Sequence, residues 1–232
     1  MYRQFGNVDY RSGFAGPGHD SLKIAQSGQL DALVALERIG TRLSFSRNDE
    51  IYAEGDASDC WYKVVSGTVR ICKLLADGRR HIAEFCFSGD CFGVDDINER
   101  PYSAEAVDNA VVMRYRRNAT EQLIDHNAAL ARLLRNTMLR DLAHAHGRTL
   151  LLGRMTAPER VAAFLLEMFE QRDRTKILDL PMSRNDIADY LGLTIETVSR
   201  TLTRLAREKA LLIVPDGIRL LSADRLEKLA AA

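Results

Sequence analysis

Turn residues interrupt the sequence at short, regular intervals between Gly40 and Arg117. Pairs such as Ser66-Gly67 and Asp77-Gly78 separate stretches rich in β-branched and aromatic residues, and the turns recur about every ten residues, a spacing typical of short antiparallel strands. A chain punctuated in this way folds into an antiparallel sandwich or roll. The clearest predicted strands are Trp61–Val65, Thr68–Leu74, His81–Phe87 and Ala110–Tyr115.

The pattern changes to helical spacing after about Thr120. Apolar residues then recur at steps of three or four and form one stripe along a long helix. A long stripe beside an isolated β roll favours a second copy of the chain as its cover, although packing on the chain's own β domain is the alternative. The predicted dimerisation residues are Leu130, Leu134, Met138, Leu142, Ala145 and Leu152.

A second helical domain is expected to begin near residue 154. Thr156 and Glu159 have the spacing of a capping box, and Pro158 lies in the first turn, where its missing N–H is tolerated. The buried face of this helix is predicted to consist of Val161, Phe164, Leu165, Met168 and Phe169.

Two short helices joined by a glycine-containing turn follow in this domain. Ser183 can cap the first helix, Gly192 interrupts it, and Thr194 can cap the second. Two apolar runs, Leu211–Val214 and Ile218–Leu221, then flank an Asp-Gly pair, which is a strong hairpin signal. The segment is therefore a predicted winged helix-turn-helix.

The charge of the whole chain gives no sign of nucleic-acid binding. It has 32 Lys+Arg against 32 Asp+Glu, whereas nucleic-acid binders usually carry a basic excess. Binding depends on local charge, however, and Arg200, Arg204 and Arg207 share one face of the second helix. A solvated charged face is the alternative interpretation of these three arginines.

The N-terminal end of a recognition helix is the part that meets base edges in the major groove. Arg200 can bond O6 and N7 of guanine, and Glu196 can accept a hydrogen bond from N4 of cytosine. Phosphate contacts fix the register without specifying sequence, and capping explains Ser183 equally well. The predicted base-contacting residues are Ile195, Glu196, Ser199 and Arg200, and the predicted phosphate-contacting residues are Ser183, Arg184, Thr194, Thr197 and Arg204.

The segment DIADYLGLTIETVSRTLTRLAREKALL (Asp186–Leu212) closely resembles the helix-turn-helix signature of the CRP/FNR family of bacterial transcription regulators, with Ala210 where the family usually has Gly. The resemblance covers residues 40–225 approximately. It implies an α+β fold with an N-terminal antiparallel, jelly-roll-like β roll, a long dimerisation helix and a C-terminal winged helix-turn-helix. The expected parts are a flexible arm (1–28), a cyclic-nucleotide-binding-like β roll (29–123), the dimerisation helix (124–153) and the DNA-binding domain (154–232).

The sensor motifs of this family can be looked for directly. Cyclic-nucleotide binders resemble G-E-x-x-G-E followed by P-R-[ST]-A, but here Val94 replaces the ribose-binding Glu and Tyr102 replaces the phosphate-binding Arg. A buried phosphate without that Arg would keep an uncompensated charge. The oxygen-sensing FNR members carry an N-terminal cysteine cluster, and this chain has no Cys before Cys60. We therefore expect no bound cofactor and no metal. A haem-dependent sensor is the alternative, for which His81 is a poor candidate ligand.

The remaining cysteines fit no metal site either. Cys60, Cys72, Cys86 and Cys91 are spaced by 12, 14 and 5 residues, which matches no common zinc or iron–sulfur pattern. We expect all four cysteines to be reduced and to pack in the protein core.

The chain looks most like the FixK-type branch of the family. Glu196-x-x-Ser199-Arg200 resembles the FNR-type reader of TTGA half-sites, which implies a homodimer on double-stranded DNA at TTGA…TCAA palindromes. The implied role is an activator that recruits RNA polymerase to genes of low-oxygen respiration and nitrogen fixation. A ligand- or redox-gated regulator and a repressor of the same fold are alternatives. A thiol- or metal-dependent enzyme is a remote one, since no G-x-S-x-G, H-E-x-x-H or P-loop motif is present.

The two ends of the sequence bear on location and turnover. No apolar run approaches the ~18 residues of a membrane-spanning helix, and the polar start lacks a signal-peptide core, so a cytoplasmic protein is expected. The end, Leu229-Ala230-Ala231-Ala232, resembles apolar tails that bacterial proteases recognise. A fraying helix end is the alternative.

Overall fold

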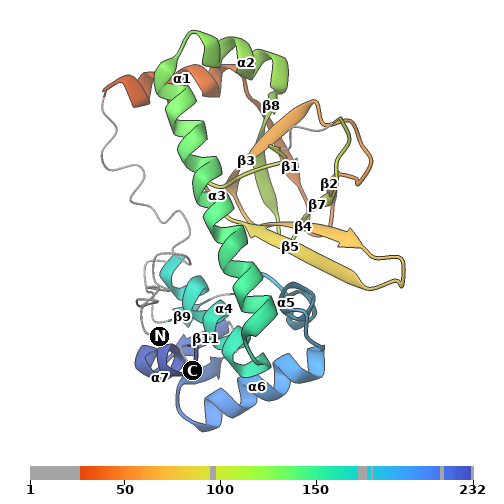
Figure 1. Cartoon of the computed structure of the whole chain (residues 1–232), viewed down its shortest axis with the longest axis vertical. Helices are drawn as coiled ribbons and strands as arrows, with labels where there is room; N and C mark the ends of the chain where they lie inside the picture. Colours follow the sequence, from red (N-terminus) through yellow and green to blue (C-terminus); the bar gives the residue numbers. More distant parts are fainter. Residues whose placement is uncertain (1–26, 95–97, 172–176, 179, 215–216, 231–232) are drawn as a thin grey trace, which may run out of the picture. The chain divides into compact units, whose positions relative to one another are not determined.

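The computed structural model describes residues 27–94, 98–171, 177–178, 180–214 and 217–230 (Figure 1). These residues form two compact units. The first contains residues 27–134 and 180–200, and the second contains 135–178 and 201–230. Two helices, α3 (Ala128–Arg154) and α6 (Ile195–Arg207), contribute residues to both units.

In the described part of the first unit, eight strands form two four-stranded antiparallel sheets (Figure 1). One sheet has the order β1 (Thr41–Phe45), β8 (Ala110–Arg116), β3 (Cys60–Ser66), β6 (Cys91–Phe92). The other has the order β2 (Glu50–Tyr52), β7 (Ser103–Ala106), β4 (Val69–Leu74), β5 (Arg80–Cys86). The four strands predicted from sequence correspond to β3, β4, β5 and β8, and the antiparallel roll is confirmed.

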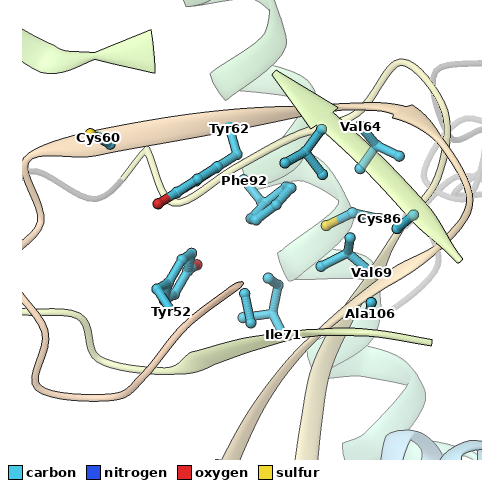
Figure 2. Close-up of a cluster of buried hydrophobic side chains, with 12 residues drawn as sticks. Tyr52, Cys60, Tyr62, Val64, Val69, Ile71, Cys86, Phe92 and Ala106 are labelled. Atoms are coloured by element: carbon cyan, nitrogen blue, oxygen red, sulfur yellow. The ribbon is translucent and has the colours of Figure 1, made fainter. Parts of the chain in front are cut away.

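The main core of the roll consists of inward-facing side chains from both sheets. Figure 2 shows the aromatic rings of Tyr52, Tyr62 and Phe92 near aliphatic side chains such as Val69 and Ile71. The Tyr62 and Phe92 rings stack with their centroids 5.2 Å apart. These two residues are neighbours within one sheet, and Tyr52 of β2 reaches them from the other sheet, with its ring centroid 5.5 Å from that of Tyr62. Each such pair contributes about 0.5–1.5 kcal/mol beyond the area that it buries.

Three of the four cysteines are buried, and two of these, Cys60 and Cys86, belong to the main core. Cys60, Cys72 and Cys86 are buried, Cys91 is half-buried, and none forms a disulfide. Burial raises the pKa of the Cys72 thiol to about 11, so the thiol stays protonated near neutral pH. A protonated thiol is a poor nucleophile and a poor metal ligand, which fits a packing role.

A second cluster joins the roll to the first turns of the long helix. Trp61 stacks on Tyr115 at a centroid distance of 4.3 Å and donates a hydrogen bond from Nε1 to Oγ1 of Thr120 at 3.0 Å. Leu36 from α1 (Ser27–Ile39) and Leu130 from α3 complete the buried cluster, and α2 (Arg117–Asp125) connects β8 to α3.

This cluster corrects the expectation for one predicted dimerisation residue. Leu130 is fully buried against its own roll, and Leu134 packs partly on the same cluster. The apolar stripe on α3 therefore begins inside the protomer, and Leu130 is not available to a second copy.

The second unit contains the hairpin expected for a wing. Strands β10 (Leu211–Val214) and β11 (Gly217–Leu220) pair, and β9 (Ile177–Leu178) adds a third strand beside β11. The predicted Pro215-Asp216 turn lies outside the described residues, as do most of the arm at 1–28 and the last two alanines. Strand β9 was not predicted because two residues give no alternation to detect.

Helices α4 (Ala157–Gln171) and α7 (Ala223–Ala230) pack together in this unit. The Thr156 N–H donates to the Glu159 carboxylate at 2.7 Å, as the capping box predicts. The five apolar residues predicted for the buried face of α4 are all buried: Val161, Phe164, Leu165, Met168 and Phe169.

Candidate nucleic-acid interface

Helix α5 (Arg184–Leu191) starts on a complete capping box. The Asp186 N–H donates to Ser183 Oγ at 3.1 Å, and the Ser183 N–H donates back to the Asp186 carboxylate at 3.0 Å. The helix ends at Gly192, whose φ of 62° is left-handed and favours glycine. Both ends of the helix are therefore fixed by local sequence, and its N-terminus presents Ser183 and Arg184 to solvent.

Helix α6 separates apolar from polar residues sharply. Val198, Leu202 and Leu205 are buried, as the helical spacing predicts. The opposite face is exposed, and it carries Glu196, Arg200, Arg204 and Arg207. Ile195, in the first turn and in line with Val198 and Leu202, is 41% exposed. A helix held by one apolar face in this way leaves its other face free for a partner.

The predicted contact residues meet at the start of α6. The Thr197 N–H donates to Thr194 Oγ1 at 3.3 Å, so Thr194 caps the helix. Arg200 Nη2 reaches Thr197 Oγ1 at 3.4 Å, and Arg184 Nη1 reaches Ser199 Oγ at 3.4 Å. These two guanidinium contacts are long and exposed, so either can be exchanged for a stronger contact to an anion or a base.

Glu196 is held in its ionised form at this surface. Hydrogen bonds from its own backbone N–H and from the Thr194 hydroxyl, together with the nearby charge of Arg200, lower the pKa of its carboxyl group. An ionised carboxylate only accepts hydrogen bonds, and this is the form needed to accept from the N4 amine of cytosine.

Arg204 lies further along α6 and already has a partner. Its Nε is 2.7 Å from Oε1 of Glu208, four residues later, and both side chains are about half exposed. Exposed pairs of this kind contribute about 0.3–0.5 kcal/mol, so the pair can open for a phosphate. Glu208 was not among the predicted residues, although its i,i+4 spacing from Arg204 was an available signal.

A buried ionic cluster that was not predicted from the sequence lies between α5 and the β roll in the first unit. Arg80 Nη2 is 2.5 Å from Asp186 Oδ1 and 2.8 Å from Asp189 Oδ2, and Arg70 Nη1 is 3.3 Å from Asp186 Oδ1. Glu105 also pairs with Arg70 at 2.6 Å. These contacts join α5 to strands β4 and β5.

Asp186 stays ionised in this cluster although it is buried. Burial alone would raise the pKa of the Asp186 carboxyl, but hydrogen bonds with Ser183 and the charges of Arg70 and Arg80 outweigh burial and lower it. The same carboxylate therefore caps α5 and ties it to the β roll.

The part of α3 that belongs to the second unit exposes large apolar side chains. Met138, Leu139, Leu142 and Leu150 are 48–58% exposed. Ala145 is also exposed and Leu152 is half-buried. Leu139 and Leu150 were not among the predicted dimerisation residues, although they extend the same apolar surface.

No helix among the described residues combines the length and apolar character that crossing a membrane requires. No group of three or more His, Cys, Asp or Glu side chains in these parts of the chain is arranged to hold a metal ion.

Comparisons with known proteins agree with this geometry. Residues 159–229 match the Crp-like helix-turn-helix domain, and residues 42–127 match the cyclic nucleotide-binding domain. The chain is 41% identical over 214 residues to the nitrogen fixation regulation protein FixK of Bradyrhizobium diazoefficiens, with 90% of each chain covered. It is 40% identical over 200 residues to the transcriptional activatory protein AadR of Rhodopseudomonas palustris, with 84% of each covered. The chain belongs to the CRP/FNR family.

The fold of this CRP/FNR protein also matches a solved relative. The structure of FixK2 from Bradyrhizobium japonicum shares 42% identity and a TM-score of 0.79, covering 84% of this chain and 98% of that one. The expected α+β fold and the FixK-type resemblance are therefore confirmed. The protein is a DNA-binding transcription regulator and not an enzyme.

The structure also locates the residues that depart from the cyclic-nucleotide motifs of the CRP/FNR family. Val94 packs against the cluster around Trp61 and Tyr115, and Tyr102 packs against the main core of the roll. The Lys73 ammonium lies 5.7 Å from the centre of the Tyr102 ring. Both substitutions thus contribute apolar packing where a nucleotide binder carries charged ligands.

Proposed function

We propose that this protein is a FixK-type transcription activator that binds TTGA…TCAA palindromes as a homodimer without a bound cofactor. The controlled genes in this proposal serve low-oxygen respiration and nitrogen fixation. The observation that carries it is the exposed N-terminal end of α6, where the ionised Glu196 and Arg200 stand on a capped, well-packed helix. The names of the FixK and AadR relatives support the biological role.

The proposed roles divide the exposed residues by chemistry. Glu196 and Arg200 read a cytosine and a guanine, each for about 1–3 kcal/mol of discrimination, and Ile195 and Ser199 contact neighbouring base edges. The phosphate contacts position the helix on the duplex and carry no sequence information. They are assigned to Ser183, Arg184, Thr194, Thr197 and Arg204.

The proposed dimer forms along the exposed part of α3. Pairing of two copies would remove from water the exposed apolar surface of Met138, Leu139, Leu142 and Leu150. The small side chain of Ala145 would allow the two helices to approach closely. Two recognition helices then lie about 34–36 Å apart, in successive major grooves on one face of the duplex.

Several assignments complete the proposal. The protein acts in the cytoplasm, where its DNA is. Its parts are the arm at 1–28, the β roll at 29–123, the dimerisation helix at 124–153 and the DNA-binding domain at 154–232. The compact units of the structure follow other boundaries because α5 packs with β5.

Two partners are also part of the proposal. RNA polymerase is the proposed partner in activation, and a protease that recognises Leu229-Ala230-Ala231-Ala232 is the proposed partner in turnover.

A redox-gated regulator is less well supported. Reversible thiol oxidation needs an exposed cysteine with a lowered pKa. Cys60, Cys72 and Cys86 are buried, and burial raises the pKa of both Cys60 and Cys72.

A repressor of the same fold is distinguished from an activator by transcription with purified polymerase. An activator raises the amount of transcript, and a repressor lowers it.

The decisive experiment is a gel-shift comparison with purified protein that has been checked for bound metal and nucleotide. We expect tight binding to a TTGA…TCAA duplex and at least tenfold weaker binding to TGTGA…TCACA, with no change in air or on addition of cyclic AMP. Equal affinity for the two duplexes would overturn the reader assignment. A requirement for a nucleotide or for anaerobic conditions would overturn the cofactor-free mechanism.

A further inference from the structure

Arg100 is a buried arginine that the DNA-binding mechanism does not use. It lies shortly before β7, and only 2% of the residue is exposed. Arginine is almost never fully buried unless its charge is compensated. Its backbone is fixed on both sides, since the Arg100 N–H donates to Asp56 O at 2.8 Å and the Gly55 N–H donates to Arg100 O at 2.9 Å.

The Arg100 guanidinium is bound as a ligand would be. Its Nη1 donates to Gly93 O at 2.8 Å, and its Nη2 donates to Cys60 O. The same group lies over the Tyr52 ring, with Cζ 4.3 Å from the ring centre, and 5.8 Å from the centre of the Tyr62 ring. Aromatic faces attract cations most strongly where water is excluded. Figure 2 shows Tyr52, Tyr62 and Cys60 at one end of the main core.

Gly93 is shaped to this guanidinium. Its φ of 69° lies in the left-handed region, and a Cβ at this position would stand 2.6 Å from Arg100 Nη1. Any larger residue would therefore collide with the guanidinium as well as strain the backbone. The close approach indicates a fitted site, made by strands β2 and β3 and by the residue that follows β6.

The site connects to the base of α3 through strand β3. One of the two carbonyls that Arg100 binds belongs to Cys60, and the next residue is Trp61. Trp61 stacks on Tyr115, and the same buried cluster contains Leu130 of α3. The position of β3 therefore determines how the first turns of α3 sit on the roll.

We propose that Arg100 is a built-in ligand of the β roll, whose guanidinium holds β2, β3 and the end of β6 together and so keeps the base of α3 fixed. The site recognises a planar guanidinium cation, and a small alkylguanidinium is the class of molecule that can replace the side chain. Arg100 acts on DNA binding only through β3 and α3, so it is a positioning residue. This inference rests on the proposed function, because the bound Arg100 side chain explains how the roll is completed without an external cofactor.

The test is chemical rescue of full-length Arg100→Ala with ethylguanidinium chloride at millimolar concentration. We expect Arg100→Ala to lose at least tenfold in affinity for the TTGA duplex and to melt at a lower temperature. Ethylguanidinium should recover most of both losses, whereas ethylammonium chloride at equal ionic strength should recover neither. Arg100→Lys should recover less than ethylguanidinium does, because an ammonium lacks the fork that bonds two carbonyls.

Arg79→Ala is the matched control, since Arg79 is an exposed arginine of the same roll that pairs with Asp77. It should behave like the wild type with or without ethylguanidinium. Wild-type affinity in Arg100→Ala, or equal rescue by both salts, would overturn the proposal. If Arg100→Ala fails to fold, refolding with ethylguanidinium should restore the folded circular dichroism spectrum, and failure to do so also overturns it. Failure of the proposed function is a separate result, in which the wild type does not bind the TTGA duplex.

Discussion

Substitution of Arg80 by Ala tests the ionic cluster that joins α5 to the β roll. The variant removes both contacts of Arg80, to Asp186 at 2.5 Å and to Asp189 at 2.8 Å. Breaking a buried ion pair destabilises a protein by about 3–5 kcal/mol because a buried charge loses its partner. Here Asp186 keeps Arg70 and Ser183, and the Arg80 side chain is 26% exposed, so we expect a smaller loss of about 2 kcal/mol.

The assay is urea unfolding of the wild type, Arg80→Ala, Asp186→Asn and the double variant. If the two side chains interact as the distances indicate, the double-mutant cycle gives a coupling free energy of about 1–3 kcal/mol. Arg79→Ala is the control, and loss of its exposed pair with Asp77 should leave the urea midpoint close to that of the wild type. A coupling below about 0.5 kcal/mol between Arg80 and Asp186 would show that the cluster does not hold α5 on the roll.

Three further outcomes are expected. Arg200→Ala should abolish the preference for the TTGA duplex over a scrambled duplex. Arg204→Ala should weaken binding to both duplexes and reduce the slope of the salt dependence by about one ion. The same loss of discrimination in both variants would contradict the assigned roles. Leu142→Asp, at a 53% exposed position on α3, should shift the protein toward monomer in analytical ultracentrifugation, whereas Leu75→Asp on an exposed loop should not; an unchanged dimer would exclude this face. Because the pKa of Asp186 is lowered from its ordinary value of 3.8, its contribution to stability is fully present above that value and is lost as the pH falls through the lowered pKa. The urea midpoints of wild type and Asp186→Asn should therefore converge below about pH 4, and a constant gap would be evidence against the shift.

The sequence predicted best those features that depend on neighbours in the chain. Ser183 and Gly192 fix the ends of α5 through bonds within a few residues, and turn residues mark the ends of β3, β4, β5 and β8. The exposed residues of α6 follow from one helical period, so the candidate interface was also predictable.

Features that depend on distant residues were missed. Arg80 and Asp186 are 106 residues apart, and nothing in either local pattern indicates that they pair. Leu130 and Leu142 have the same helical spacing, yet the first is fully buried and the second is exposed. Periodicity gives the direction of a side chain on its helix but not which surface covers it, so only the folded chain could separate them.

The unequal burial of the four cysteines gives this protein an intrinsic labelling site. Cys60, Cys72 and Cys86 are no more than 6% exposed, whereas Cys91 is half-buried. A maleimide dye applied to the native protein should therefore react at Cys91 first, without any engineered substitution. Cys91 pairs with Lys63 across β3 and β6 and lies two residues before Gly93, so the dye's fluorescence would report movement of that strand edge during DNA binding.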